Sequence, residues 1–153
     1  MVEHYLPRGA GDALPATPAG AVVALAERLE LLLSIFAKGE RPTGSSDPYA
    51  LRRAGNGVVQ ILWGMAWRLD LMAFLSKAVG EWVALFPAFA VDASKLHNDL
   101  CQLMRQRIVS QLEDDGFAPD LVQAVAGDAV YSQRLLSDPL DVKQRIQLLR
   151  DLR

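Results

Sequence analysis

Side chains that could ligate a metal or act as catalytic bases are few and widely separated in this sequence. The two histidines, His4 and His97, lie far apart, so no short zinc-ligand spacing such as His-x-x-x-His occurs. Glu27 and Glu30 are three positions apart, which places two carboxylates on one helix face, but no histidine accompanies them. This spacing favours surface or capping histidines and solvated carboxylates over a metal site.

The single cysteine, Cys101, excludes an internal disulfide and is typical of a reducing compartment. Its apolar neighbours predict a packed thiol. The glycine pairs at 9–11 and 55–57 lack the preceding strand and the following Lys-Ser/Thr of a phosphate-binding loop. We interpret the first pair as a turn and the second as a close helix contact.

Four cations gather around one loop between residues 38 and 53, namely Lys38, Arg41, Arg52 and Arg53. The loop also contains glycines and serines, which let a phosphate approach backbone N–H groups. Arginine can clamp a phosphate through two parallel hydrogen bonds. These residues are therefore candidate phosphate contacts, such as the backbone of an RNA would supply. A solvated basic loop, or an arginine paired with Glu40 or Asp47, explains the same pattern.

Apolar residues recur three and four positions apart along most of the chain, which predicts helices that bury one face. A cap residue followed by proline marks helix starts at Thr17, Asp47 and Asp138, and Asp70 and Asp92 are further caps. We expect helices over residues 17–39, 47–65, 70–87 and 92–114, and further helices from near 119, 128 and 138.

No segment alternates apolar and polar residues as a strand would, so the predicted fold class is all-α, an irregular bundle of about six to seven helices. Gly55 and Gly57 fall inside the second helix, where each costs about 1 kcal/mol relative to alanine. We therefore expect a neighbouring backbone very close to them. The acidic run from Glu113 to Asp115 opposes the helix dipole at the end of its helix, and the sequence offers no reason for it.

Composition limits the partners. The chain of 153 residues is 51% hydrophobic with a formal net charge of -2, so any RNA contact must come from a local patch. A mean hydropathy of +0.13 predicts that part of the apolar surface meets other protein. We see no signal peptide and no apolar run of about 18 residues, so we expect a cytoplasmic protein with no membrane partner.

Residues 3–63 resemble the signature region of the β subunit of bacterial heterotetrameric glycyl-tRNA synthetases. A proline-bearing HYLPR segment precedes a helix of the AxADKLD form, followed by a GxxPTGSxDPxALRR loop. Residues 100–127 and the segment SDPLDVKQRIQLLRDL resemble that family more loosely. Two departures are Glu27 and Glu30 in place of aspartates, and ALRRAGNG where ALRRAALG is usual.

The resemblance implies an internal fragment of that subunit. Residues 1–90 would be the C-terminal part of an HD-like helical domain, and residues 91–153 a helical region that leads to an anticodon-binding domain. The implied partners are tRNA(Gly), the α subunit and the remainder of the β subunit, without DNA. No cofactor is implied for this segment, because ATP and Mg are used by the α subunit. The segment would contribute tRNA binding and assembly to glycine-tRNA ligase without a catalytic site.

Two other functions are also compatible with the sequence. One is a purely structural helical scaffold that binds other protein through its apolar surface. The other is a degenerate HD-type metal phosphohydrolase, which would need a divalent ion near Glu27.

Overall fold

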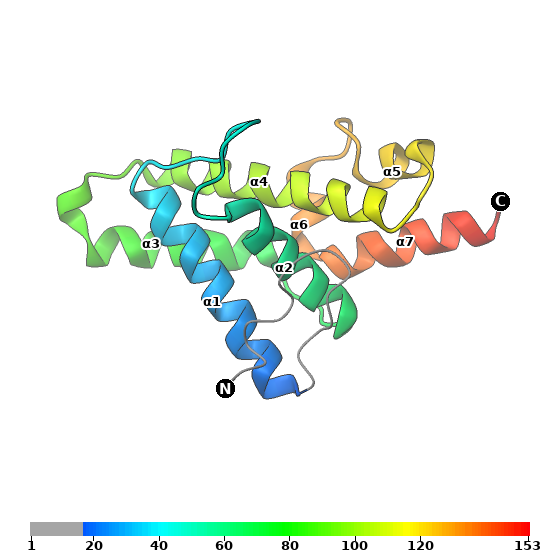
Figure 1. Cartoon of the computed structure of the whole chain (residues 1–153), viewed down its shortest axis with the longest axis horizontal. Helices are drawn as coiled ribbons and strands as arrows, with labels where there is room; N and C mark the ends of the chain where they lie inside the picture. Colours follow the sequence, from blue (N-terminus) through cyan, green and yellow to red (C-terminus); the bar gives the residue numbers. More distant parts are fainter. Residues whose placement is uncertain (1–16) are drawn as a thin grey trace.

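The computed structural model describes residues 17–153, which form an irregular helical bundle (Figure 1). His4, the turn predicted at residues 9–11 and the HYLPR segment lie outside these residues. Within 17–153 there are seven α-helices and no strand, so the all-α prediction is confirmed. The elements are α1 (Pro18–Ala37), α2 (Leu51–Gly64), α3 (Leu71–Leu85), the 3-10 helix η2 (Pro87–Phe89), α4 (Ala93–Asp114), α5 (Pro119–Ala126), α6 (Ser132–Ser137) and α7 (Pro139–Asp151).

Most helices begin at the predicted caps. Thr17 Oγ1 accepts a hydrogen bond from the Gly20 N–H at 3.0 Å, and Pro18 occupies the first position of α1. The carboxylates of Asp70, Asp92 and Asp138 accept from the N–H three residues further on in α3, α4 and α7. These bonds satisfy backbone donors that have no partner inside the helix, and the predicted starts are confirmed.

Two predicted starts are wrong. The second helix begins at Leu51 and not at Pro48, because residues 48–50 form a turn in which Ala50 has a φ of +54°. Asp47 nevertheless caps it from outside, since its two carboxylate oxygens accept from the N–H groups of Leu51 at 2.8 Å and Arg52 at 2.9 Å. The helix expected near Asp128 begins at Ser132, after a turn closed by the Val130 N–H and the Gly127 carbonyl.

The centre of the bundle is α4, which packs against α1, α2, α3, α5 and α6 (Figure 1). Leu100, Met104 and Ile108 follow one face of α4 and are fully buried. The main core cluster includes residues from all seven helices and so extends to both sides of residue 90, where the predicted division falls. The division into residues 1–90 and 91–153 stays a prediction about domains.

The small residues in α2 accommodate arginine side chains and not a neighbouring backbone, so that expectation was wrong. A Cβ on Gly57 would lie 2.4 Å from Arg28 Nε of α1, and one on Gly55 would lie 2.8 Å from Arg107 Cγ of α4. Burial lowers the pKa of both guanidinium groups from the ordinary arginine value. The Arg28 and Arg107 side chains thus pack against the backbone of α2 at Gly57 and Gly55, where α2 has no side chain.

The acidic end of α4 has a partner that the sequence did not reveal. Asp115 forms an ion pair with Lys143 of α7. Lys143 Nζ also lies 4.8 Å from the Trp63 ring centroid and 5.1 Å from that of Phe117, within reach of cation–π contacts. The carboxylate that opposes the helix dipole therefore helps to fix α7 against the end of α4.

Candidate nucleic-acid interface

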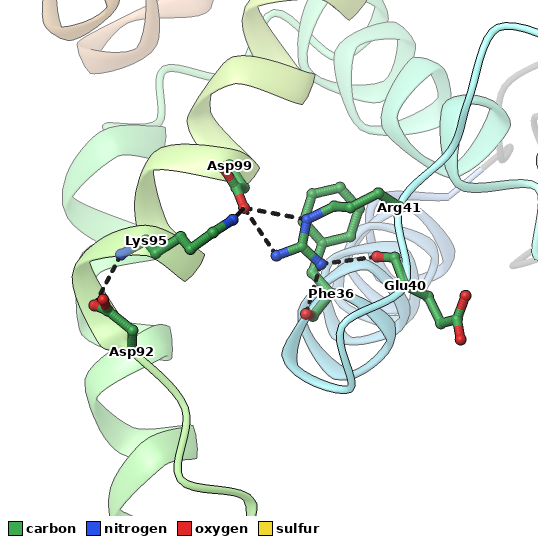
Figure 2. Close-up of polar contacts among 6 residues, drawn as sticks. All are labelled: Phe36, Glu40, Arg41, Asp92, Lys95 and Asp99. Carbon is green, nitrogen blue, oxygen red and sulfur yellow. Dashed lines mark hydrogen bonds and ion pairs between the residues drawn. The ribbon is translucent and has the colours of Figure 1, made fainter.

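Arg41 holds the loop after α1 against α4 (Figure 2). Its Nε and Nη2 donate to one carboxylate oxygen of Asp99, at 3.2 and 2.9 Å. Its Nη1 donates to the carbonyl oxygens of Phe36 at 2.7 Å and Glu40 at 2.8 Å. The guanidinium carbon lies 4.3 Å from the centroid of the Phe36 ring. Most donors of Arg41 are therefore used within the protein.

Asp99 receives a second cation, Lys95, whose Nζ lies 2.8 Å from the oxygen that Arg41 contacts. The hydrogen bond from Lys95, and after it that from Arg41, hold the pKa of the Asp99 carboxyl below its ordinary value, although desolvation acts in the opposite direction. The Arg41 and Asp99 side chains are each 31% exposed, so solvent screens the pair in part. The pair positions the loop, and Lys95 brings the three side chains to a net charge of +1.

Arg52 closes the same loop from its other end. Its Nη2 donates to the Thr43 carbonyl oxygen. Thr43 in turn brackets a tight turn, because its N–H donates to the Ser46 carbonyl at 2.7 Å and its Oγ1 accepts from the Ser46 N–H at 3.0 Å. Together with Asp47 at the start of α2, these bonds give the segment between α1 and α2 a defined conformation.

Lys38 and Arg53 differ from the two bracing arginines. Both residues are exposed, and neither side chain forms an ion pair or hydrogen bond with another residue of the range 17–153. Lys38 follows the last turn of α1, and Arg53 lies in the first turn of α2. The structure thus divides the four predicted contacts into two that brace the loop and two with unengaged charges.

The alternative of an arginine paired with Glu40 or Asp47 is not what the described residues show. Arg41 contacts the carbonyl oxygen of Glu40, and its ion-pair partner is Asp99, 58 positions away in the chain. Sequence reasoning missed Lys95 and Asp99. Their spacing of four on a predicted helix was the signal that could have marked them as a pair.

The residues considered for metal chemistry do not meet. Glu27 and Glu30 are exposed on α1, and within 17–153 no three His, Cys, Asp or Glu side chains are placed to hold a metal ion. His97 is half-buried, with Nε2 3.4 Å from the Met72 carbonyl oxygen and 3.6 Å from Cys101 Sγ. Cys101 is buried, which raises the pKa of its thiol to about 11, so the prediction of a packed thiol is confirmed.

The fold and the loop define an all-α module whose exposed feature is a braced cationic turn. None of its described helices combines the length and apolar character needed to cross a membrane. A family profile described as "Glycyl-tRNA synthetase beta subunit" matches residues 1–127. The chain therefore belongs to the glycyl-tRNA synthetase beta subunit family, and the resemblance seen in the sequence is confirmed.

Individual relatives agree with this assignment. The glycine-tRNA ligase beta subunit of Trichodesmium erythraeum is 46% identical over 156 residues, which cover 100% of this chain and 21% of the relative. That of Synechocystis is 41% identical, over 100% of this chain and 22% of the relative. That of Pseudomonas aeruginosa is 40% identical, over 99% of this chain and 20% of the relative. The chain thus spans about a fifth of the length of the curated relatives it matches.

Proposed function

We propose that this chain is a non-catalytic part of glycine-tRNA ligase that contacts tRNA(Gly) through the loop after α1. It also takes part in assembly with the α subunit and the remainder of the β subunit. In this proposal ATP and Mg are bound by the α subunit, where glycine is activated, and this segment holds no cofactor. The relatives' names support the enzyme to which the chain would belong.

The proposed RNA contact is supported mainly by the defined conformation of the loop between α1 and α2. Arg41, Arg52 and Asp47 fix its backbone through hydrogen bonds at both ends, so little conformational entropy is lost when a ligand binds. Lys38 and Arg53 are left to meet phosphates, which fix the register of an RNA without reading its sequence. Arg52 donates to the Thr43 carbonyl oxygen through Nη2 alone, so its other N–H groups are available to bind phosphate.

The test is charge reversal at Arg53 in the assembled α/β enzyme, with tRNA(Gly) affinity measured over a range of salt concentrations. Arg53→Glu is expected to weaken binding and to reduce the slope of log K against log salt by about one, because one phosphate contact is lost. Arg134→Glu on α6 is the matched control, since Arg134 is also exposed. Equal affinity and slope for the Arg53 variant and the wild type would show that Arg53 does not contact tRNA.

Exposed leucines at the end of the chain support the assembly role. They equally favour the alternative of a purely structural helical scaffold that binds other protein. Leu148 and Leu149 in the last turn of α7 are 59% and 38% exposed, and Leu152, directly after the helix, is 75% exposed. Aliphatic side chains exposed together are typical of protein interfaces. Replacing Leu148 and Leu152 by serine is expected to weaken subunit association in sedimentation experiments and to leave the helix content unchanged. A variant that assembles as the wild type does would exclude this surface.

A further inference from the structure

An aromatic cluster is exposed where α3 ends. The ring centroids of Trp82 and Phe86 are 4.8 Å apart, those of Trp82 and Phe89 are 5.3 Å apart, and those of Phe86 and Phe89 are 6.3 Å apart. Phe86 is 46% and Phe89 49% exposed, so about half of each side chain meets solvent. Pro87 ends α3 and begins η2, which turns the chain so that Phe89 lies beside the Trp82 ring. The result is an aromatic platform, defined here as Trp82, Phe86 and Phe89.

The platform borders a cationic groove. Phe89 lies on one wall of an open groove of about 440 Å³, together with the residues that lead into α4. The C-terminal end of α1 and the loop that follows it, including Phe36, Lys38 and Arg41, also line the groove. Lys95 of α4 also lines the groove. Two aromatic rings and three cations, from the end of α1 and its loop and from η2 and the start of α4, therefore share a single concave surface.

The charges of this groove favour an anion. Arg41 and Lys95 both contact Asp99, so two positive charges face one carboxylate (Figure 2). The Asp92 carboxylate accepts from the Lys95 N–H at the start of α4 and remains a negative charge on the lining. Lys38 adds an unengaged positive charge, and Figure 2 shows the Glu40 carboxylate directed away from Arg41 and Asp99.

From this arrangement we propose that the groove binds an unpaired segment of RNA. Lys38 and Lys95 contact its phosphates, and one base stacks on Phe89. The inference rests on the proposed function and specifies which part of an RNA this face accepts. Every base has a π-face, so stacking is tolerant of sequence, but the face is accessible only when the base leaves a helix. A duplex would offer phosphates to the lysines and nothing to the ring.

A protein partner would use this surface differently. The exposed leucines at the end of α7 present aliphatic area, which fits protein packing, whereas here an aromatic side chain lines a groove together with cations. That pairing of stacking platform and positive groove is the arrangement by which proteins bind single strands.

The test uses the full 153-residue chain and two fluorescein-labelled probes, an unstructured uridine decamer and an RNA duplex of ten base pairs. Anisotropy titrations should show tighter binding of the single strand. Phe89→Ala is expected to weaken it roughly 5- to 100-fold, from the usual contribution of one stacked base. Lys38→Ala should lower the salt slope by about 0.7, the value for one phosphate of a single strand.

Two variants control the interpretation. Phe89→Leu keeps apolar area but removes the π-face, so it should bind the decamer as weakly as Phe89→Ala does. Tyr131→Ala removes an aromatic side chain that is 83% exposed outside the groove, and it should bind as the wild type does. Circular dichroism of each variant verifies the fold.

Two results of these titrations would overturn the inference: equal affinity for the two probes, and wild-type affinity of the Phe89 variants. A third measurement uses Phe89→Ala in the assembled α/β enzyme. If that variant loses subunit association while decamer binding is unchanged, the platform is a protein docking site and the inference is wrong. The two proposals can fail independently. If Arg53→Glu weakens tRNA binding but Phe89→Ala does not weaken decamer binding, only the groove proposal is rejected. If Phe89→Ala weakens decamer binding but Arg53→Glu does not weaken tRNA binding, only the contact at Arg53 is rejected.

Discussion

Arg41 donates from Nε and Nη2 to the same oxygen of Asp99, at 3.2 and 2.9 Å, and so joins the loop after α1 to the central helix α4. The two residues are 58 positions apart. Lys95 contacts the same oxygen from one turn earlier in α4. Three charged groups therefore hold the predicted RNA loop, and their contribution to stability must depend on the charge of Asp99.

The Asp99 pair predicts a specific pH dependence. The folded-state pKa of Asp99 lies below its ordinary value of 3.8, so its stabilising effect is present above about pH 4 and is lost as the pH falls through the folded pKa. Asp99→Asn should lower the free energy of unfolding by about 0.5–1 kcal/mol at neutral pH, since the pair is partly exposed. Urea denaturation from about pH 7 to about pH 3 should show this difference shrinking below about pH 4. A difference that grows on acidification would contradict the assignment.

Gly57 should not tolerate a methyl group. The methyl of an alanine there would lie 2.4 Å from Arg28 Nε, and Arg28 is held by a 3.0 Å hydrogen bond to the Ala24 carbonyl. We expect Gly57→Ala to destabilise the protein by about 1–3 kcal/mol, because overpacking outweighs the better helix propensity of alanine. Gly80→Ala in α3 is the control, since a methyl group at that position would meet no atom of another element within 4 Å. It should stabilise by about 0.5–1 kcal/mol in the same thermal unfolding experiment.

Asp47 should stabilise α2 although it lies four residues before Leu51. Asp47→Ala removes acceptors for two backbone N–H groups and is expected to cost about 1–2 kcal/mol in chemical denaturation. Asp47→Asn keeps one carbonyl oxygen and should lose about half as much. Ser45→Ala, at an exposed position in the same loop, should change stability by less than about 0.5 kcal/mol. Equal stability of the Asp47 and Ser45 variants would show that the cap is dispensable.

Cys101 should be nearly inert in the folded protein. Its pKa of about 11, against an ordinary 9.0, reduces the thiolate fraction at pH 8 by about 100-fold. Alkylation by iodoacetamide at about pH 8 should therefore be at least about 100-fold slower in buffer than in denaturing urea. Because the chain has one cysteine, mass spectrometry reports this site alone. Similar rates in the two conditions would mean that the thiol is not buried.

Local signals in the sequence were sufficient to predict most helix starts. Thr17, Asp70, Asp92 and Asp138 each bind an N–H within the next turn, so their roles depend only on neighbouring residues. The start of α2 was missed because Asp47 reaches across a turn in which Ala50 takes a left-handed conformation. Alanine rarely adopts that conformation, so the residue type at position 50 gave no signal of the turn.

The sequence by itself determined an all-helical chain, the places where most helices begin, and a loop with four cations. Only the tertiary structure decided that Arg41 and Arg52 brace this loop while Lys38 and Arg53 remain unengaged within the described range 17–153. It also decided that Arg28 and Arg107 fill the space above two glycines, and that Asp115 pairs with Lys143. The physical reason is range: capping and helix periodicity act within a few residues, whereas the partner of a long charged side chain is chosen by which helices pack together.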